Sequence, residues 1–196
     1  MGIGYKTAKE LYLETQMQIT RSSDAWTSFL DSSTWMFEYT FGEQLLIYAQ
    51  RPDARACATM KKWNESFNRW VKKGSTAITV LKYLDGKSML NSIFDISDTY
   101  PTFKKPYNLW KLNKEADAEE YIEALESKYG ELKSKNTLPN AIISAAQNLT
   151  EDNLKSYLDE AVKYTDMDED SFRKLFSEIV EVSVMYSALT RCGFDA

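Results

Sequence analysis

The sequence predicts an α+β protein, in which an N-terminal domain of mixed helices and a β-hairpin is followed by an all-α C-terminal segment. Apolar residues recur at helical spacing over most of the chain, and one stretch at 76–96 changes to the two-residue period of strands. Beyond residue 113 only helical patterns occur. With 196 residues, 43% of them hydrophobic and 13% aromatic, the chain can bury a substantial core.

Charge divides the chain into two predicted domains, 1–112 and 113–196. The first carries 15 basic and 11 acidic residues, whereas the second carries 9 basic and 18 acidic residues. All five tryptophans lie in the first domain. This asymmetry predicts a basic working surface and an acidic helical companion, with 111–117 as the linker.

The first helical pattern, 24–50, divides into two pieces. Asp24 is the expected N-cap of the first piece. Thr40 and Glu43 have the spacing of a capping box before the second piece, which Pro52 ends.

Three polar or aromatic residues of the second piece share one helix face. Gln44, Tyr48 and Arg51 follow each other at i, i+4 and i+7 and combine an amide, a ring and a cation. We therefore expect a contact surface on this face. A short helix from about Thr59, with Trp63 on its apolar side, leads into the basic stretch 69–74.

A β-hairpin is predicted over 76–96, because apolar residues alternate there and Asp85-Gly86 is a strong turn signal. Lys82 and Lys87 near its tip are expected to extend away from the sheet. The aromatic stretch 100–110 contains proline and is expected to be irregular.

The acidic half is predicted to be wholly helical. Helical patterns cover 116–129, a segment around 138–149, 154–164 and the final stretch 172–193. Thr150 is the expected N-cap of the third of these helices.

Basic and aromatic residues interleave most densely between Arg51 and Lys87. This stretch of 37 residues holds nine basic and three acidic side chains, together with Trp63, Phe67 and Trp70. Such a mixture suits single-stranded nucleic acid, whose phosphates attract cations and whose unstacked bases offer ring faces. In the alternative interpretation the rings form the core and the lysine stems lie along it.

Composition argues against enzymatic chemistry and against a cofactor. The chain has no histidine and only two cysteines, which excludes histidine-dependent nucleophiles and histidine-ligated or four-cysteine metal sites. Asp166, Asp168 and Asp170 begin like a calcium loop, but Ser171 and Ser177 stand where that loop needs Gly and Glu. We expect no metal, no cofactor and no small-molecule substrate.

Asp95 and Asp98 allow two interpretations, a shared metal or a turn after a strand, and the second is favoured. No stretch is long and apolar enough to cross a membrane, and no signal peptide is recognisable. We therefore expect a cytoplasmic protein with no membrane partner.

Several strings together resemble a known family. They are Tyr39-Thr-Phe-Gly-Glu-Gln44-Leu-Leu-Ile-Tyr48-Ala-Gln50-Arg51-Pro52, then Trp63, then Arg69-Trp-Val-Lys-Lys-Gly74-Ser-Thr-Ala-Ile78 and Phe94-Asp95-Ile-Ser-Asp98-Thr. In order and spacing this region, roughly 26–99, resembles the N-terminal single-stranded-DNA-binding domain of ArdC-type antirestriction proteins. Similar domains occur in large multidomain proteins of conjugative and other mobile elements.

The resemblance implies DNA binding by particular residues. Carried over by position, it nominates Tyr39, Gln44, Tyr48, Gln50, Arg51, Trp63, Arg69, Lys72 and Lys73, to which the hairpin pattern adds Lys82. Two departures are evident. Glu43 stands where the family commonly shows Asn, and the chain lacks the His-Glu-x-x-His helix of the metalloprotease-like domain in a full ArdC protein.

Two function hypotheses follow. The first is a non-catalytic module that binds single-stranded DNA between the Gln44-Tyr48-Arg51 face and the hairpin entrance at Lys72 and Lys73, and so protects transferred DNA from host defence. The alternative is a protein inhibitor of a host restriction or CRISPR nuclease, acting through the acidic half. A scaffold segment of a longer chain is a third possibility.

Overall fold

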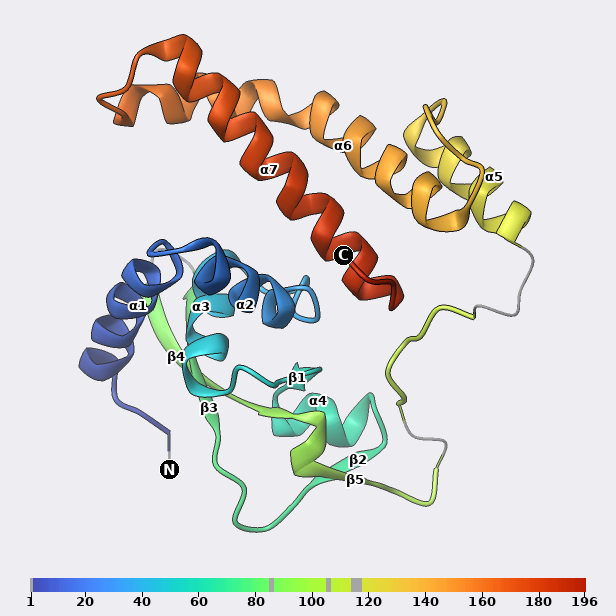
Figure 1. Ribbon diagram of the computed structural model, residues 1–196. Coiled ribbons are helices and arrows are strands. Elements are labelled where there is room, and N and C mark those ends of the chain that lie inside the picture. The colour runs from blue at the N-terminus through green and yellow to red at the C-terminus, as the bar shows by residue number, and fades with distance from the viewer. Residues whose placement is uncertain (1, 85–86, 105–106, 114–117) are drawn as a thin grey trace. The chain divides into compact units, whose positions relative to one another are not determined.

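The computed structural model describes residues 2–84, 87–104, 107–113 and 118–196, and it divides into two compact units (Figure 1). They are Met1–Trp110 and Lys111–Ala196, so the division falls two residues before the predicted domain boundary. All described strands belong to the first unit, and helices make up the second, which confirms the predicted α+β class. Part of the expected linker, 114–117, lies outside the described residues.

Among the residues that the structure describes, the N-terminal unit combines helices with five strands. In chain order it contains α1 (Tyr5–Ile19), α2 (Ser23–Ser33), α3 (Phe41–Gln50), β1 (Cys57–Ala58), α4 (Met60–Glu65), β2 (Arg69–Val71), β3 (Ile78–Leu84), β4 (Lys87–Asp95), the 3-10 helix η1 (Ile96–Asp98) and β5 (Thr99–Pro101).

The predicted hairpin forms the main sheet. β3 and β4 pair antiparallel from Ile78 opposite Ile93 to Leu84 opposite Lys87, and β1 adds to the other edge of β4. The expected turn residues, 85 and 86, lie outside the described residues. β3 is consequently an edge strand, a position that normally leaves backbone groups unpaired.

α3 packs on this sheet and contributes the centre of the main core. Leu46 and Ile47 of the helix are fully buried with Val80 of β3. The predicted capping box is confirmed, since Glu43 N donates to Thr40 Oγ1 and Glu43 Oε2 accepts from Thr40 N. These bonds occupy the Glu43 carboxylate within its own helix.

Helix α1 was not predicted from the sequence. Its buried side is sparse, with Ala8, Thr15 and Ile19 as its buried residues. The Thr15 hydroxyl donates to Leu11 O at 2.7 Å, which allows a polar residue to lie in the core. An interrupted apolar stripe of this kind gives a weak helical signal.

A second, smaller core supports β2 and β5. The fully buried Trp63 of α4 lies at its centre with Ala58 and Phe94. Phe67 and Tyr107 pack against the indole, with ring centroids 5.1 and 6.3 Å from it. The stretch 100–110, expected to be irregular, therefore contributes a strand, β5, and part of this core.

The C-terminal unit consists of α5 (Ala118–Tyr129), α6 (Leu138–Ala161), the 3-10 helix η2 (Val162–Tyr164) and α7 (Glu169–Cys192). The prediction that Thr150 begins a helix is wrong, because α6 runs through it and its hydroxyl donates to Ala146 O, one turn back. Asp168 caps α7 by accepting from Ser171 N.

Candidate nucleic-acid interface

The two-stranded sheet of β2 and β5 presents two aromatic side chains on one face. Trp70 lies directly opposite Tyr100 in the antiparallel register, so both side chains leave the same side. Trp70 is 47% exposed and Tyr100 is 50% exposed. We call the two-stranded sheet of β2 and β5, with its two exposed rings, the aromatic ribbon.

The opposite side of the ribbon is anchored in the small core. Val71 packs against the Trp63 cluster, and Thr99 is buried. Arg69 Nε donates to Thr99 Oγ1 at 2.6 Å, and its Nη1 donates to Tyr107 O at 3.3 Å. The strands that carry the two exposed rings are therefore held in place by packing and hydrogen bonds on their other face.

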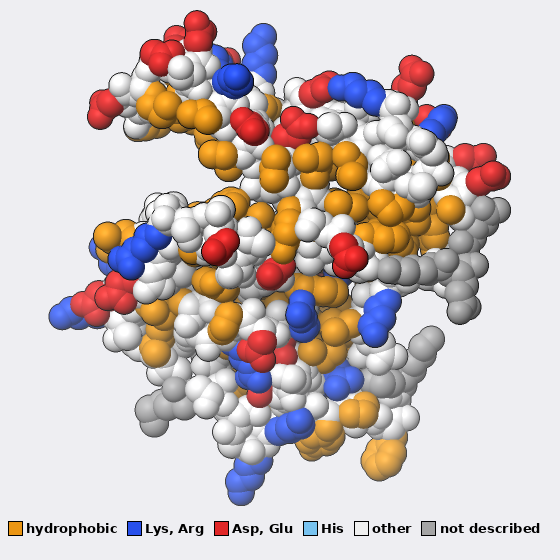
Figure 2. All heavy atoms as spheres, viewed as in Figure 1, with side chains coloured by type: hydrophobic (Ala, Val, Ile, Leu, Met, Phe, Trp, Pro, Cys, Tyr) orange, Lys and Arg blue, Asp and Glu red, His pale blue; other side chains and the backbone are white. Residues whose placement is uncertain are grey.

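Cations follow the ribbon along the chain. Lys72 and Lys73 come directly after β2 and are exposed. Gly74 has a φ of 90°, which favours glycine and lets the chain turn toward β3. Around β2 and β5, in the lower part of the N-terminal unit, Figure 2 shows blue Lys and Arg side chains interleaved with orange hydrophobic ones.

Lys82 is exposed and lies in the hairpin, as predicted. It lies on β3 opposite Met89 of β4, and Met89 is exposed too. The hairpin therefore presents a cation next to a flexible apolar side chain. It belongs to a different sheet from β2 and β5.

A group at the end of the ribbon, which we call the turn cluster, contains Arg51, Lys72, Ser97 and Asp98. Arg51 Nη1 pairs with Asp98 Oδ2 at 2.6 Å, and its Nη2 donates to Ser97 Oγ at 3.0 Å. Lys72 Nζ donates to Ser97 O at 2.8 Å, and Lys72 N donates to Asp98 O at 2.8 Å. The hydrogen bond to Asp98 raises the pKa of the Arg51 guanidinium.

Asp95 stabilises the same turn from inside. Its Oδ2 accepts from the backbone amides of Arg55 and Ala56, and its Oδ1 accepts from Ser97 N. Burial by itself would raise the pKa of this carboxyl, but the hydrogen bonds from Ser97, Arg55 and Ala56 outweigh it and lower the pKa. The turn interpretation of Asp95 and Asp98 is thereby confirmed.

Four predicted contact residues of the α3 region make hydrogen bonds or ring contacts within the domain. Tyr39 Oη donates to Cys57 O at 2.7 Å, and burial raises the pKa of the phenol. Gln44 Nε2 donates to Met36 O and Tyr39 O. Tyr48 packs edge-on against Phe29, and Gln50 bonds to the backbone of β3.

The prediction that Trp63 contacts DNA is corrected by the structure. Its side chain is 0% exposed, and its indole Nε1 donates to Phe94 O at 2.8 Å. A ring buried on both faces has no surface for a base to stack on. For Trp63 the alternative interpretation applies, in which the rings form the core and lysines lie along it. Lys62 fits the same interpretation, because its Nζ lies 5.3 Å from the centroid of the Phe67 ring.

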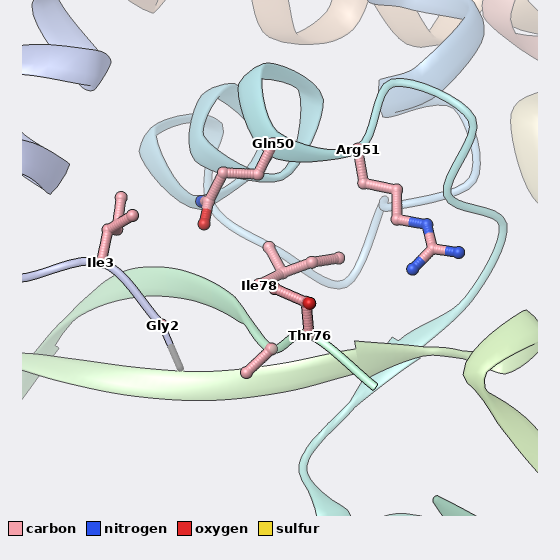
Figure 3. A pocket seen from close by; sticks show the side chains of 7 residues that line it. Gly2, Ile3, Gln50, Arg51, Thr76 and Ile78 are labelled. Carbon is pink, nitrogen blue, oxygen red and sulfur yellow. The ribbon is translucent and has the colours of Figure 1, made fainter. Parts of the chain in front are cut away.

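A cavity of about 240 Å³ lies between the end of α3 and the start of β3. Its lining comprises Gly2, Ile3, Gln50, Arg51, Thr76, Ala77 and Ile78. Figure 3 shows that the adjacent side chains of Gln50 and Arg51 point in different directions. Of the five residues that define the predicted groove, only Arg51 lines this cavity, whereas Gln44, Tyr48, Lys72 and Lys73 do not.

In the C-terminal unit, several acidic side chains form ion pairs. Glu126 pairs with Lys135, Glu151 with Lys133, Glu160 with Lys163, and Glu169 and Asp159 both with Arg173. These pairs offset part of the negative charge within the unit itself.

The aromatic ribbon contains the site residues that the sequence did not nominate. Trp70 belongs to the interleaved rings of 51–87, but the resemblance does not nominate it, and Tyr100 lies in a stretch that the sequence predicts to be irregular. The signal was the alternation of Arg69, Trp70 and Val71, which a strand of three residues displays too briefly to be distinctive.

No helix among the described residues has the length and apolar character needed to cross a membrane.

Comparisons with protein-family models, with curated proteins and with solved structures found no match to this chain.

Proposed function

We propose that the N-terminal unit is a non-catalytic module that binds single-stranded DNA through the aromatic ribbon and the lysines beside it. The observation that carries this proposal is the exposure of Trp70 and Tyr100 on one face, next to Lys72 and Lys73. The resemblance to ArdC-type domains supports the same conclusion.

The chemistry of the ribbon favours unpaired strands. Each exposed ring offers a face on which one base can stack, a contact worth about 1 to 3 kcal/mol. Bases within a duplex are already stacked on each other and present only their edges. Lysines beside the rings would neutralise phosphates, each contact adding about 0.7 to the magnitude of the salt slope.

In a mobile element, such binding would shield transferred DNA from host defence, as the resemblance implies. The rival function, inhibition of a host nuclease by the acidic half, is less well supported. The ion pairs of Glu126, Glu151 and Glu160 reduce the uncompensated negative charge that an imitation of nucleic acid would need.

Fluorescence anisotropy with a labelled oligothymidylate tests the proposal, with a duplex of the same length as competitor and a series of salt concentrations. We expect the single strand to bind more tightly than the duplex. Tyr100→Ala should weaken binding by about 1 to 3 kcal/mol, the value of one stacked base.

Matched variants make this test specific. Tyr5 of α1 is 49% exposed, almost the same as Tyr100, so Tyr5→Ala removes an equivalent ring elsewhere. Lys6 and Lys9, also exposed on α1, provide the corresponding control for a Lys72→Ala, Lys73→Ala double variant. Absence of binding by the unaltered protein would refute the proposal, as would equal losses in the Tyr5 and Tyr100 variants.

A further inference from the structure

The turn cluster contains two cations that approach one short segment from different parts of the chain. Arg51 follows α3, and Lys72 follows β2, yet both donate to Ser97. Lys72 lies two residues beyond Trp70 along the chain, and Lys72 N bonds to Asp98 O, continuing the backbone ladder of the ribbon. The cluster is therefore the direct continuation of the surface to which we assign base stacking.

The carboxylate of Asp98 accepts the shortest hydrogen bond in this cluster, from Arg51 Nη1. The distance of 2.6 Å between Arg51 Nη1 and Asp98 Oδ2 is that of a short charge-assisted hydrogen bond. Both partners retain some contact with solvent, with 27% of the Arg51 side chain and 14% of the Asp98 side chain exposed. A phosphodiester, like a carboxylate, spreads one negative charge over two oxygens, and both groups accept charge-assisted hydrogen bonds from a guanidinium.

The other acids near Arg51 have different roles. Asp95 is buried and accepts three backbone amides, so it does not compete for the guanidinium. Asp53 lies 3.8 Å from Arg51 Nε but is 82% exposed. Of these three, Asp98 alone holds a guanidinium N–H at hydrogen-bond distance.

We propose that Arg51, Lys72 and the Ser97 hydroxyl form a phosphate subsite of the nucleic-acid interface, and that Asp98 is an internal competitor that a phosphate displaces. This inference rests on the proposed function. Binding then exchanges one ion pair for another, so Asp98 reduces the affinity that Arg51 contributes. Asp98 is a positioning residue, because it acts through the guanidinium.

Replacement of Asp98 tests this exchange. In Asp98→Asn the guanidinium loses its ionic partner, and we expect oligothymidylate to bind about tenfold more tightly, the equivalent of one charge-assisted hydrogen bond. The salt slope should stay nearly the same, because Arg51 contacts the phosphate in the bound state of both proteins. Asp53→Asn, which removes an equal charge beside the same guanidinium, should change affinity much less.

A double-variant cycle separates exchange at Arg51 from general repulsion. In an Arg51→Ala background, Asp98→Asn should improve binding by no more than about twofold, because the residue that it releases is absent. Thermal unfolding of every variant shows whether each is folded at the assay temperature.

The outcomes separate this inference from the proposed function. If Asp98→Asn is folded and binds no better, or gains equally with and without Arg51, the competitor role is overturned while ribbon binding stands. If neither the unaltered protein nor Asp98→Asn binds the oligonucleotide, the proposed function and this inference both fail.

Discussion

The side-chain amide of Gln50 is bonded to both backbone groups of Thr79. Its Nε2 donates to Thr79 O at 2.8 Å, and its Oε1 accepts from Thr79 N at 3.0 Å. Because β3 is an edge strand, Gln50 occupies the position that a neighbouring strand would fill. A residue nominated for DNA contact thus joins α3 to the sheet.

Gln50→Ala should accordingly destabilise the N-terminal unit. Both backbone groups of the buried Thr79 would lose their partners, at a cost of about 1 to 3 kcal/mol for each group that water cannot reach. Urea unfolding measures this loss. A variant with unchanged stability but lost oligonucleotide binding would instead assign Gln50 to the interface.

Trp63 and Trp70 should respond oppositely to replacement by phenylalanine. Trp63→Phe removes the hydrogen bond to the Phe94 carbonyl and should cost about 1 to 3 kcal/mol of stability, without altering DNA affinity of the folded protein. Trp70→Phe should leave stability almost unchanged and weaken binding. Paired urea-unfolding and anisotropy measurements check both, and the reverse pattern would contradict the placement of the rings.

Protonation of Asp95 should limit stability in acid. Its pKa in the folded state lies below the ordinary value of 3.8, so the carboxylate stabilises the fold above that pH. This contribution is lost as the pH falls from about 4 through the folded-state pKa. Urea unfolding between roughly pH 3 and pH 7 should show the onset of this loss at the acid end, and Asp95→Asn should show a smaller dependence on pH.

The thiol of Cys57 should be unreactive in the folded protein. Burial raises its pKa, chiefly through desolvation, with the charge of Asp95 acting in the same direction. The thiolate is the reactive form, so a Cys192→Ser variant, in which Cys57 is the only cysteine, should react slowly with a disulfide reagent at neutral pH. Denaturant should restore rapid reaction. Equally fast labelling without denaturant would contradict this desolvation of the half-buried thiol.

Local signals in the sequence determined the start of α3 and the main hairpin, whereas the caps expected at Asp24 and Thr150 do not form, since Ser22 caps α2 and α6 runs through Thr150. The capping box of Thr40 and Glu43 forms between residues three apart, so the sequence itself contains both partners. The alternation from Ile78 to Val80 likewise specifies a strand within a few residues. These features were predictable because their hydrogen bonds and periodicity are short in range.

Tertiary structure alone decided which rings are exposed to solvent and which cations are paired with acidic side chains. Trp63 and Trp70 are seven positions apart in similar surroundings, yet packing against Phe94 buries the first, and pairing with Tyr100 exposes the second. Arg51 meets Asp98 across 47 positions. Contacts between such distant residues depend on how the whole chain closes, and no local period or cap encodes them.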